Sequence, residues 1–467
     1  MKKYDDTSKA SIIDFAKKLR GQTLREACGK EIEAHGIQGK GNFGQILEKY
    51  YFEYPINSKA EPDFPKVGIE LKSSPLKVLK NDQVRAKERV VLSIIDYLKV
   101  HEEHFETSSF WQKNSHLLFV FYLHSKDEYL LDYLIKLVDD WEYSADDKRV
   151  IRHDWEIINQ KIKDGKAHEL SEGDTFYLGA CTKGSTAMKS LRVQPFNDEK
   201  AKQRAYSLKP GYVNHIIAKI AQAETGVYGK LFEQPAVLCA NLSIEEIVNL
   251  HFKPFYGMDV DNILKKLNVK PNKNAKNFLA SLTKAILGFE SNQEIEEFVK
   301  ADVQVKTIRL QENTLPKESV SFPCFEYRSL IETDWEDSEF KSILESKFLF
   351  IFYQIEGKKL FLKEAKFWNM PNADILEAKQ VWDVTVKNIK TGKIVKEVTK
   401  TKAGKKKRHT YFPKSKHNRI SHVRPHAKNS HDTFDLPVAD NKTGVTEYTK
   451  HCFWLNNRYV RDEICLK

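Results

Sequence analysis

Two carboxylates and a lysine stand close together near the start of the chain, in a spacing that could serve a metal ion. Two carboxylates around one hard divalent cation, with water and phosphate in its other positions, is the usual way in which proteins hold Mg²⁺. Such a cation polarises a phosphate and lowers the pKa of an attacking water. These residues therefore predict a metal-dependent phosphodiesterase core, in which the lysine orients the water or stabilises developing charge. They are Asp63, Glu70 and Lys72, in the segment Asp63-Phe64-Pro65-Lys66-Val67-Gly68-Ile69-Glu70-Leu71-Lys72.

A strand over residues 67–72 would bring these groups together. Residues i and i+2 of a strand point to the same face, so Glu70 and Lys72 project together while the apolar residues between them pack inward. Asp63 precedes the strand and can fold back toward the same end, and Glu48, on a preceding helix, could add a further carboxylate. The competing interpretation is an edge strand with a solvated Glu–Lys pair, because one Asp, one Glu and one Lys at fixed spacing is a weak motif by itself.

A degraded copy of the segment recurs about half a chain later. The copy keeps the lysine, as Lys306, but has Gln304 in place of the glutamate. Four matched pairs occur in the same order, and a repeat this long indicates two whole domains rather than a solenoid. The first half is therefore predicted to cut and the second only to bind. The pairs are Asn42-Phe43 with Asn277-Phe278, Ile69-Glu70-Leu71-Lys72 with Val303-Gln304-Val305-Lys306, Leu118-Phe119-Val120-Phe121-Tyr122 with Leu349-Phe350-Ile351-Phe352-Tyr353, and Trp155 and Gly165 with Trp382 and Gly392.

Hydrophobic spacing predicts the elements that carry these motifs. Apolar residues recur at helical spacing over residues 10–27 and 43–52, and residues 117–122 form a continuous apolar strand. Residues 154–165 read as a helix closed by glycine. The predicted fold class is α/β, with a mixed sheet flanked by helices in each half.

The length of the chain is sufficient for two domains of ordinary size. Its 467 residues allow two separate hydrophobic cores. The next helix after the first half begins near Ser243, so the junction falls before it. We expect domains at residues 1–222 and 243–467, joined by a linker at residues 223–242.

Composition indicates a globular protein with an anionic partner. Apolar residues make up 41% and charged residues 30% of the chain, and no apolar run approaches the ~20 residues that span a bilayer. The six cysteines lack metal-ligand spacing and predict reduced thiols, and the start of the chain is acidic rather than apolar. We expect a cytoplasmic protein that is a monomer in solution, with no membrane partner. The net charge of +11 favours a polyanion as the partner.

The positive charge is concentrated in one stretch. Between Lys390 and Lys428 fourteen Lys or Arg residues accompany one acid, Glu397. Such a segment favours contact with phosphates and a strong salt dependence of binding. The alternative is a solvated surface loop. Its densest part is Lys405, Lys406, Lys407 and Arg408, close to Tyr411 and Phe412.

Taken together, the motifs resemble the MutH family. That family comprises the mismatch-repair nicking endonuclease and related type II restriction endonucleases that cut at GATC. The duplicated length is similar to the two-domain restriction enzymes, which implies two tandem restriction-endonuclease-like domains. The resemblance rests on Lys40-Gly41-Asn42-Phe43-Gly44-Gln45-Ile46-Leu47-Glu48 with the segment from Asp63 to Lys72, and continues through Gly21-Gln22-Thr23-Leu24, Asp154-Trp155-Glu156 and Lys209-Pro210-Gly211-Tyr212.

The resemblance implies catalytic roles for the matching residues of the first half. Asp63 and Glu70 would ligate Mg²⁺, and Lys72 would act at the attacking water. Glu48 matches an additional acidic residue of the family. Lys87 matches a lysine near the scissile phosphate.

The resemblance also implies residues that read the bases. Tyr212 matches a tyrosine that approaches the adenine of the site. The Arg-Pro loop of the family appears in the first half as Cys181-Thr182-Lys183-Gly184, which leaves Lys183 as its candidate. The second half keeps the loop intact as Val423-Arg424-Pro425, and the arginine can grip O6 and N7 of a guanine. The half that lost a metal ligand thus keeps the better reading loop.

The predicted function is that of a type II restriction endonuclease with an effector domain. It would make Mg²⁺-dependent double-strand cuts before the G of GATC and leave 5′ overhangs. The second half, with Gln304 and Thr283 near the places of the two glutamates, would bind another GATC site of double-stranded DNA and loop the DNA between. Two alternatives are a mismatch-repair-type nicking endonuclease and a non-catalytic DNA-binding regulator with a vestigial nuclease motif. An RNA-processing nuclease shares the chemistry but lacks support from any RNA-binding signature.

Overall fold

A computed structural model gives the positions of most of the chain. Its contacts divide the chain into two compact units. The first unit holds Met1–Ile244 and Asn292–Val303, and the second holds Glu245–Ser291 and Gln304–Lys467. The segment from Asn292 to Val303, which we expected in the second domain, belongs to the first unit. The structure describes residues 3–29, 42–54, 61–79, 82–125, 127–184, 190–223, 226–233, 242–400, 404 and 406–466.

The first sheet of the first unit is mixed and carries the predicted catalytic strand. In this sheet β1 (Glu70–Val78) lies between β2 (Val84–Ala86) and β4 (His116–Leu123), and β5 (Ile135–Glu142) pairs with the far side of β4. β1 runs parallel to β4, and the other pairs are antiparallel. Six consecutive residues of β4 are buried, as its continuous apolar sequence predicts.

A second, antiparallel sheet completes the core of the first unit. It places β9 (Arg204–Leu208) between β3 (Val90–Ile94) and β6 (Leu178–Thr182). Two small ladders lie outside it: β7 (Leu191–Gln194) with β8 (Asn197–Lys202), and β10 (Tyr228–Gly229) with β11 (Glu294–Ile295). The helices of the unit are α1 (Lys9–Lys17), α2 (Leu24–Cys28), α3 (Asn42–Ile46), α4 (Tyr97–Val100), α5 (Ser109–Asn114), α6 (Ala145–Lys163), α7 (Pro210–Ile220) and α11 (Glu296–Lys300).

Three elements of the first unit differ from their predicted limits. The helix expected over residues 10–27 is two helices, because Gly21 has φ 83° and the Thr23 side chain caps α2. The helix expected over residues 43–52 is α3 followed by the π-helical turn η2 (Leu47–Tyr51). The helix expected over residues 154–165 is α6, which begins well before residue 154. Ser144 caps it by accepting a hydrogen bond from the Asp147 N–H at 3.1 Å.

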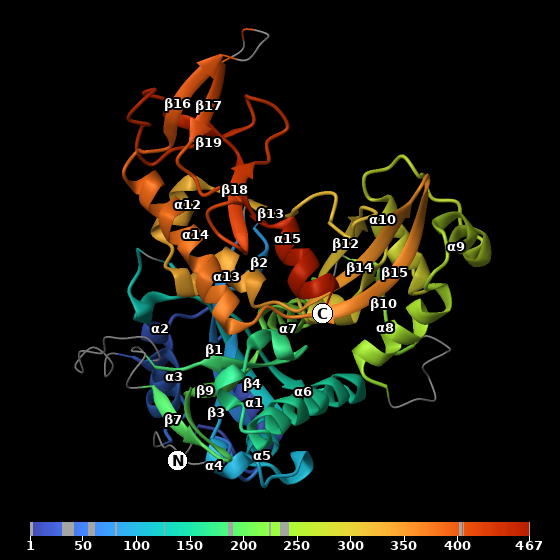
Figure 1. Cartoon of the computed structure of the whole chain (residues 1–467). Helices are drawn as coiled ribbons and strands as arrows, with labels where there is room; N and C mark the ends of the chain where they lie inside the picture. The colour runs from blue at the N-terminus through green and yellow to red at the C-terminus, as the bar shows by residue number, and fades with distance from the viewer. Residues whose placement is uncertain are drawn as a thin grey trace. The chain divides into compact units, whose positions relative to one another are not determined.

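The second unit repeats the arrangement of both sheets. β12 (Gln304–Leu310) runs parallel to β14 (Phe348–Glu356), and β15 (Lys359–Trp368) pairs antiparallel with β14 as a long hairpin (Figure 1). The antiparallel sheet places β21 (His451–Leu455) between β13 (Val320–Phe325) and β18 (Ser421–Pro425). β12 forms the edge of its sheet in the described part of the chain, whereas the edge of β1 is covered by β2.

The remaining elements of the second unit surround these sheets. A basic hairpin is formed by β16 (Val395–Lys400) and β17 (Lys406–Thr410), and β19 (Thr433–Asp435) pairs with β20 (Glu447–Thr449). The helices are α8 (Ile244–Phe252), α9 (Val260–Leu267), α10 (Phe278–Ile286), α12 (Tyr327–Glu332), α13 (Glu339–Leu344), α14 (Asn372–Lys390) and α15 (Asn457–Tyr459).

The pairs matched in sequence occupy equivalent places in the two units. Leu71 pairs with Leu118 across β1 and β4, and Val305 pairs with Leu349 across β12 and β14. The tryptophans of the fourth pair lie on α6 and α14, which are both 19 residues long. Each of these helices is followed by a glycine of positive φ, a conformation that favours glycine after a helix end. The two units therefore share one topology.

Each unit has its own core of buried apolar residues. No helix within the described ranges is long and apolar enough to cross a bilayer. The five cysteines that the structure describes carry free thiols, in agreement with the predicted reduced state.

Candidate active site and nucleic-acid interface

A tight turn before β1 joins the two predicted metal ligands. The predicted strand start at residue 67 is wrong, because residues 65–68 form a turn in which Gly68 has φ 71°. Phe64 then bridges back to Ile69. As a result the Asp63 N–H donates to Oε2 of Glu70 at 3.1 Å, and Oδ2 of Asp63 accepts from the Leu71 N–H at 2.9 Å. The fold-back inferred from the sequence is present.

Two lysines meet the buried carboxylate of Glu70. The side chain of Glu70 is 4% exposed, and its Oε1 lies 2.7 Å from Nζ of Lys72. Nζ of Lys72 also donates to the Leu92 carbonyl at 3.1 Å, which fixes the lysine between β1 and β3. Nζ of Lys113, on α5, lies 3.6 Å from the same Oε1. Sequence reasoning missed Lys113, although it is the one charged residue of α5.

A third carboxylate approaches from the preceding helix. Glu48 lies on the π-helical turn η2 and is half-buried. A methyl group at Gly44 would lie 3.2 Å from Oγ of Ser73 and 4.0 Å from Oε1 of Glu48. Glycine at this position therefore lets α3 come close to β1, and the close approach sets Glu48 beside the strand.

The carboxylates disturb one another's protonation. Burial, followed by the charge of Glu70, raises the pKa of Asp63 to about 7. Burial and then Glu70 also raise the pKa of Glu48, while Lys72 and Lys113 oppose the shift. Like charges in a poorly hydrated place favour the neutral forms. A bound cation would reverse this by favouring the ionised carboxylates.

The donor set suits a hard divalent metal. Asp63 and Glu70 present carboxylate oxygens, which Mg²⁺ prefers. The Tyr54 hydroxyl is buried without a hydrogen-bond partner in the described part of the chain, and burial, then Asp63, raises its pKa. Within the described ranges no three Asp, Glu, His or Cys side chains form a complete ligand cluster. The two carboxylates would therefore hold a metal whose other positions are open to water and phosphate.

The structure places the predicted Lys87 outside this group. Lys87 is exposed just after β2, and its backbone N–H donates to the Pro75 carbonyl at 3.0 Å. The second lysine that the structure brings to Glu70 is Lys113.

The predicted base-reading residues of the first unit lie at different depths. Lys183 is half-buried just beyond β6, and its N–H donates to the Gln203 carbonyl at 2.8 Å. Tyr212 is fully buried, with its ring centroid 5.0 Å from that of Tyr177. A direct contact of Tyr212 with a base would therefore require α7 to move. The equivalent tyrosine of the second unit, Tyr459, is buried as well.

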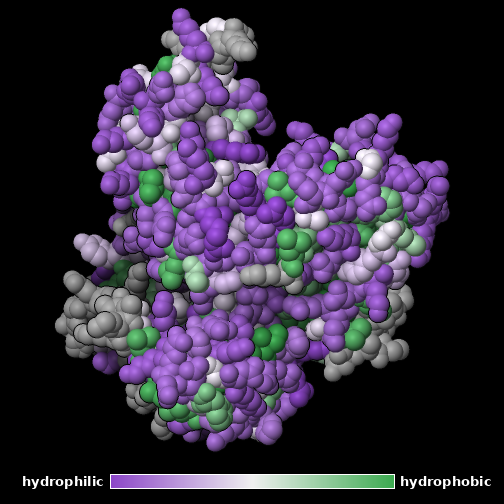
Figure 2. Space-filling model, viewed as in Figure 1, coloured by the Kyte–Doolittle hydropathy of each residue, from purple (hydrophilic) through white to green (hydrophobic). Residues whose placement is uncertain are grey.

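The predicted DNA-binding residues of the second unit lie on strands with exposed side chains. Arg424 is exposed on β18, and its guanidinium lies 3.8 Å from the centre of the Trp454 ring, a cation–π stack. Lys407 and Arg408 are exposed on β17, next to Lys406. Lys405 lies outside the described residues. The face drawn in Figure 2 is mostly hydrophilic over β16 and β17.

The second unit lacks the acidic group. Gln304 and Lys306 start β12 as Glu70 and Lys72 start β1. The buried Thr283, near the place of Glu48, donates its hydroxyl to the Leu279 carbonyl at 2.9 Å. Glu297 stands seven residues before Gln304, as Asp63 stands before Glu70, but it packs in the first unit.

The carboxylate of Glu297 is engaged there by backbone groups. Its two oxygens accept from the Leu231 N–H at 2.9 and 3.0 Å. Glu297 thus belongs to the first unit, whereas Gln304 begins a segment of the second.

Comparison with known proteins gives two kinds of match. A family model described as the DNA mismatch repair enzyme MutH matches residues 52–154, a range that includes Asp63, Glu70, Lys72 and Lys113. The type II restriction enzyme Sau3AI of Staphylococcus aureus is 36% identical over 98% of this chain and 98% of its own length. The DNA mismatch repair protein MutH of Vibrio campbellii is 26% identical, over 46% of this chain and 96% of its own length.

Proposed function

Because the chain belongs to the MutH-like family of type II restriction endonucleases, we propose that it makes Mg²⁺-dependent double-strand cuts at 5′-GATC-3′. The cut would fall before the G and leave 5′ overhangs. The chain is a site-specific deoxyribonuclease, and membership of its family implies DNA binding and dependence on a divalent metal. The observation that carries the proposal is the junction of Asp63, Glu70 and Lys72 at the start of β1.

Each residue of the site has a distinct task in this proposal. Mg²⁺, when bound by Asp63 and Glu70, would polarise the scissile phosphate and lower the pKa of the attacking water. Lys72, held by Glu70 and by the Leu92 carbonyl, orients the water. Lys113 adds a second positive charge beside Glu70, where negative charge develops on the phosphate. Glu48 supports the site from η2.

The second unit acts as an effector in this proposal. It binds a further GATC duplex through Arg424 and the basic hairpin, does not hydrolyse it, and stimulates the first unit. One monomeric chain thereby bridges two sites and loops the DNA between them. The exposed, stacked Arg424 and the loss of both carboxylates at Gln304 and Thr283 support this division of tasks. The two units would be the functional domains.

Two alternatives are less well supported. A mismatch-repair-type nicking enzyme needs a single unit, and the MutH relative matches only 46% of this chain, whereas the restriction enzyme matches 98%. A DNA-binding regulator with a vestigial nuclease motif would not need Asp63, Glu70 and Lys72 in contact.

The decisive experiment is digestion of plasmids of known sequence, with Mg²⁺ or with EDTA, followed by mapping of the ends. We expect linear products with 5′ overhangs at GATC, and none in EDTA. Ends at another sequence would contradict the specificity. Nicked circles alone would favour the nicking enzyme, and intact plasmid under all metal conditions would favour the regulator.

The effector role is tested on plasmids with one or two GATC sites. The two-site plasmid should be cut faster, and a GATC oligonucleotide added in trans should restore the rate on the one-site plasmid. Equal rates that do not respond to the oligonucleotide would contradict the effector proposal without touching the nuclease assignment.

A further inference from the structure

The second unit has a cavity beside β12, the strand that is equivalent to β1 of the first unit. The cavity measures about 280 Å³, several times the ~30 Å³ that one water occupies in the liquid. It lies between β12, an edge strand, and β13. We call it the β12 cleft. Its lining includes the cations Lys306, Arg309 and Lys317, the hydroxyl groups of Thr307, Ser319 and Ser321, and the acid Glu318.

The lysine of this cleft, Lys306, is half-buried and has no counter-charge among the described residues. Burial lowers the pKa of Lys306, and within the described part of the chain no carboxylate pairs with it. Its Nζ lies 5.7 Å from the centre of the Phe322 ring. In the first unit Lys72 has Oε1 of Glu70 at 2.7 Å. The substitution of Gln304 for the glutamate thus leaves the second lysine unpaired.

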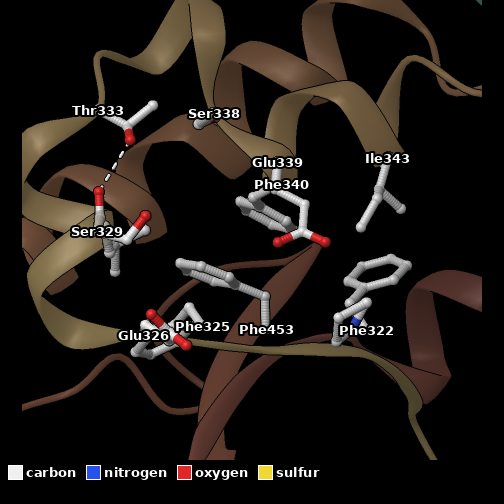
Figure 3. Close-up of a pocket in the computed structure, with 12 residues that line it drawn as sticks. Phe322, Phe325, Glu326, Ser329, Thr333, Ser338, Glu339, Phe340, Ile343 and Phe453 are labelled. Atoms are coloured by element: carbon white, nitrogen blue, oxygen red, sulfur yellow. Dashed lines mark hydrogen bonds between the residues drawn. The ribbon is translucent and has the colours of Figure 1, made fainter. Parts of the chain in front are cut away.

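The aromatic ring beneath Lys306 is held firmly. The centroid of the Phe322 ring lies 5.9 Å from that of Phe340 and 6.4 Å from that of Phe348. Figure 3 shows Phe322 beside Phe340 and Phe453 at an aromatic cavity on this part of β13. The ring that Lys306 contacts therefore belongs to the aromatic core of the second unit.

An unpaired, partly buried ammonium destabilises a fold, because desolvation disfavours its charge. A cation–π contact with phenylalanine compensates only in part. An anion in the cleft would supply the missing counter-charge, and three cations with three hydroxyl groups against one acid suit a phosphate. The same antiparallel sheet that borders the cleft through β13 carries Arg424 on β18.

We propose that the β12 cleft binds one backbone phosphate of the effector DNA directly, without a metal ion. Lys306 provides the charge that the metal provides in the first unit. The proposal rests on the proposed function, since it needs the second unit to bind DNA. A phosphodiester of DNA is favoured over a free phosphate because Arg424 of the same sheet would hold the duplex beside the cleft.

The first test compares Lys306→Met with Lys358→Met, a matched change of an exposed lysine of the same unit. Both are made in a full-length Glu70→Gln chain, and binding of GATC duplexes is titrated in EDTA. We expect two duplexes per parent chain and a ten- to hundredfold weaker second duplex in Lys306→Met, the loss of one charge-assisted contact. Lys358→Met should match the parent. Lys306→Met should also unfold at the same or a higher temperature, since methionine removes a buried charge, so misfolding cannot mimic the result.

The second test identifies the phosphate. Duplexes with a single neutral methylphosphonate at each successive position are titrated against the parent and Lys306→Met. We expect one position to weaken the parent about tenfold and to leave Lys306→Met unchanged, with the salt slope of the variant smaller by about one charge. Inorganic phosphate is added in parallel, to compete with the duplex.

The outcomes separate this proposal from the function on which it rests. A single duplex per parent chain would overturn the effector function itself. Two duplexes bound equally by parent and Lys306→Met, or a second duplex that needs Mg²⁺, would overturn the cleft and leave the effector function standing. Loss of inorganic phosphate binding in Lys306→Met with unchanged duplex binding would assign the cleft to a free anion, and would also overturn the proposal.

Discussion

The equivalent strands β1 and β12 each carry a lysine, but the charges around the two lysines are opposite. At the start of β1, three carboxylates crowd together, and the pKa values of Asp63 and Glu48 are raised. At the start of β12, Gln304 removes the acid, and the pKa of the unpaired Lys306 is lowered by burial. One fold can thus meet a phosphate in two ways. The acidic form needs a cation as intermediary, whereas the basic form can bind the phosphate itself.

The largest expected effect comes from replacing Glu70 of the first unit by glutamine, the residue that the second unit has as Gln304. Glu70→Gln should lower cleavage by roughly a thousandfold or more, because it removes a metal ligand and the partner of Lys72. Binding of GATC duplexes should persist, since most affinity comes from phosphate contacts. Single-turnover cleavage and gel-shift titration measure the two effects. Normal cutting by Glu70→Gln would mean that the assigned site is wrong.

The reverse exchange serves as its control. Gln304→Glu should not create a second cutting site, because Glu297 belongs to the first unit and Thr283 has no carboxylate. A Glu70→Gln, Gln304→Glu double variant that cuts would show that one carboxylate suffices.

A smaller loss is expected from the lysine that only the structure brings to the site. Lys113→Ala should lower the cleavage rate about a hundredfold, as the loss of one group that stabilises transition-state charge does. Lys87→Ala is the matched control and should cut within a few-fold of the parent, since Lys87 is exposed beyond β2. Rates measured at saturating DNA separate chemistry from binding. The opposite ranking of the two variants would restore Lys87 as the residue at the phosphate.

Lys113 and Lys87 show which features of the site could be predicted from the sequence and which could not. Local patterns predicted the strands, the duplication and the contact between Asp63 and Glu70, because strand periodicity and a short turn determine them. The partnership of Lys113 with Glu70 depends on how α5 packs against β3, and no local spacing encodes it.

Burial depth and element limits were also beyond the sequence. The resemblance implied a role for Tyr212, but it did not show that this side chain is fully buried on the inner face of α7. The strand was predicted to begin at Val67 rather than at Glu70, because Val67 and Gly68 fit an apolar strand. The positive φ of Gly68, which ends that possibility, is visible only in the structure. The first turn of α6, which follows the Ser144 cap, is polar. Hydrophobic periodicity therefore did not indicate where this helix begins.

The proposed effector role of the second unit can be tested at Arg424, its candidate base-reading residue. Arg424→Ala should reduce the cutting rate on a two-site plasmid to the one-site rate, a change of about fivefold or more if the coupling between sites is of ordinary size. The stack on Trp454 would hold the guanidinium in place for the proposed contact with a guanine. Arg458→Ala, in the same unit, is the control. A two-site rate that survives Arg424→Ala would place recognition elsewhere in the second unit.

The smallest effect is the pH dependence that Asp63 of the first unit contributes to stability. The pKa of Asp63 is about 7 in the folded, metal-free chain and about 3.9 in an unfolded one. Between these values the folded state holds the extra proton, so the contribution of Asp63 to the stability of the metal-free protein should fall as pH rises from about 4 to about 7 and then level off. The unfolding temperature of the parent in EDTA should therefore fall by a few degrees across this window relative to that of Asp63→Asn. Glu356→Gln, a change of an exposed acid of the second unit, should follow the parent. Mg²⁺ should stabilise the parent most above pH 7, where Asp63 is ionised. A profile that Asp63→Asn leaves unchanged would show that the crowding of carboxylates at β1 is not what distinguishes the two units.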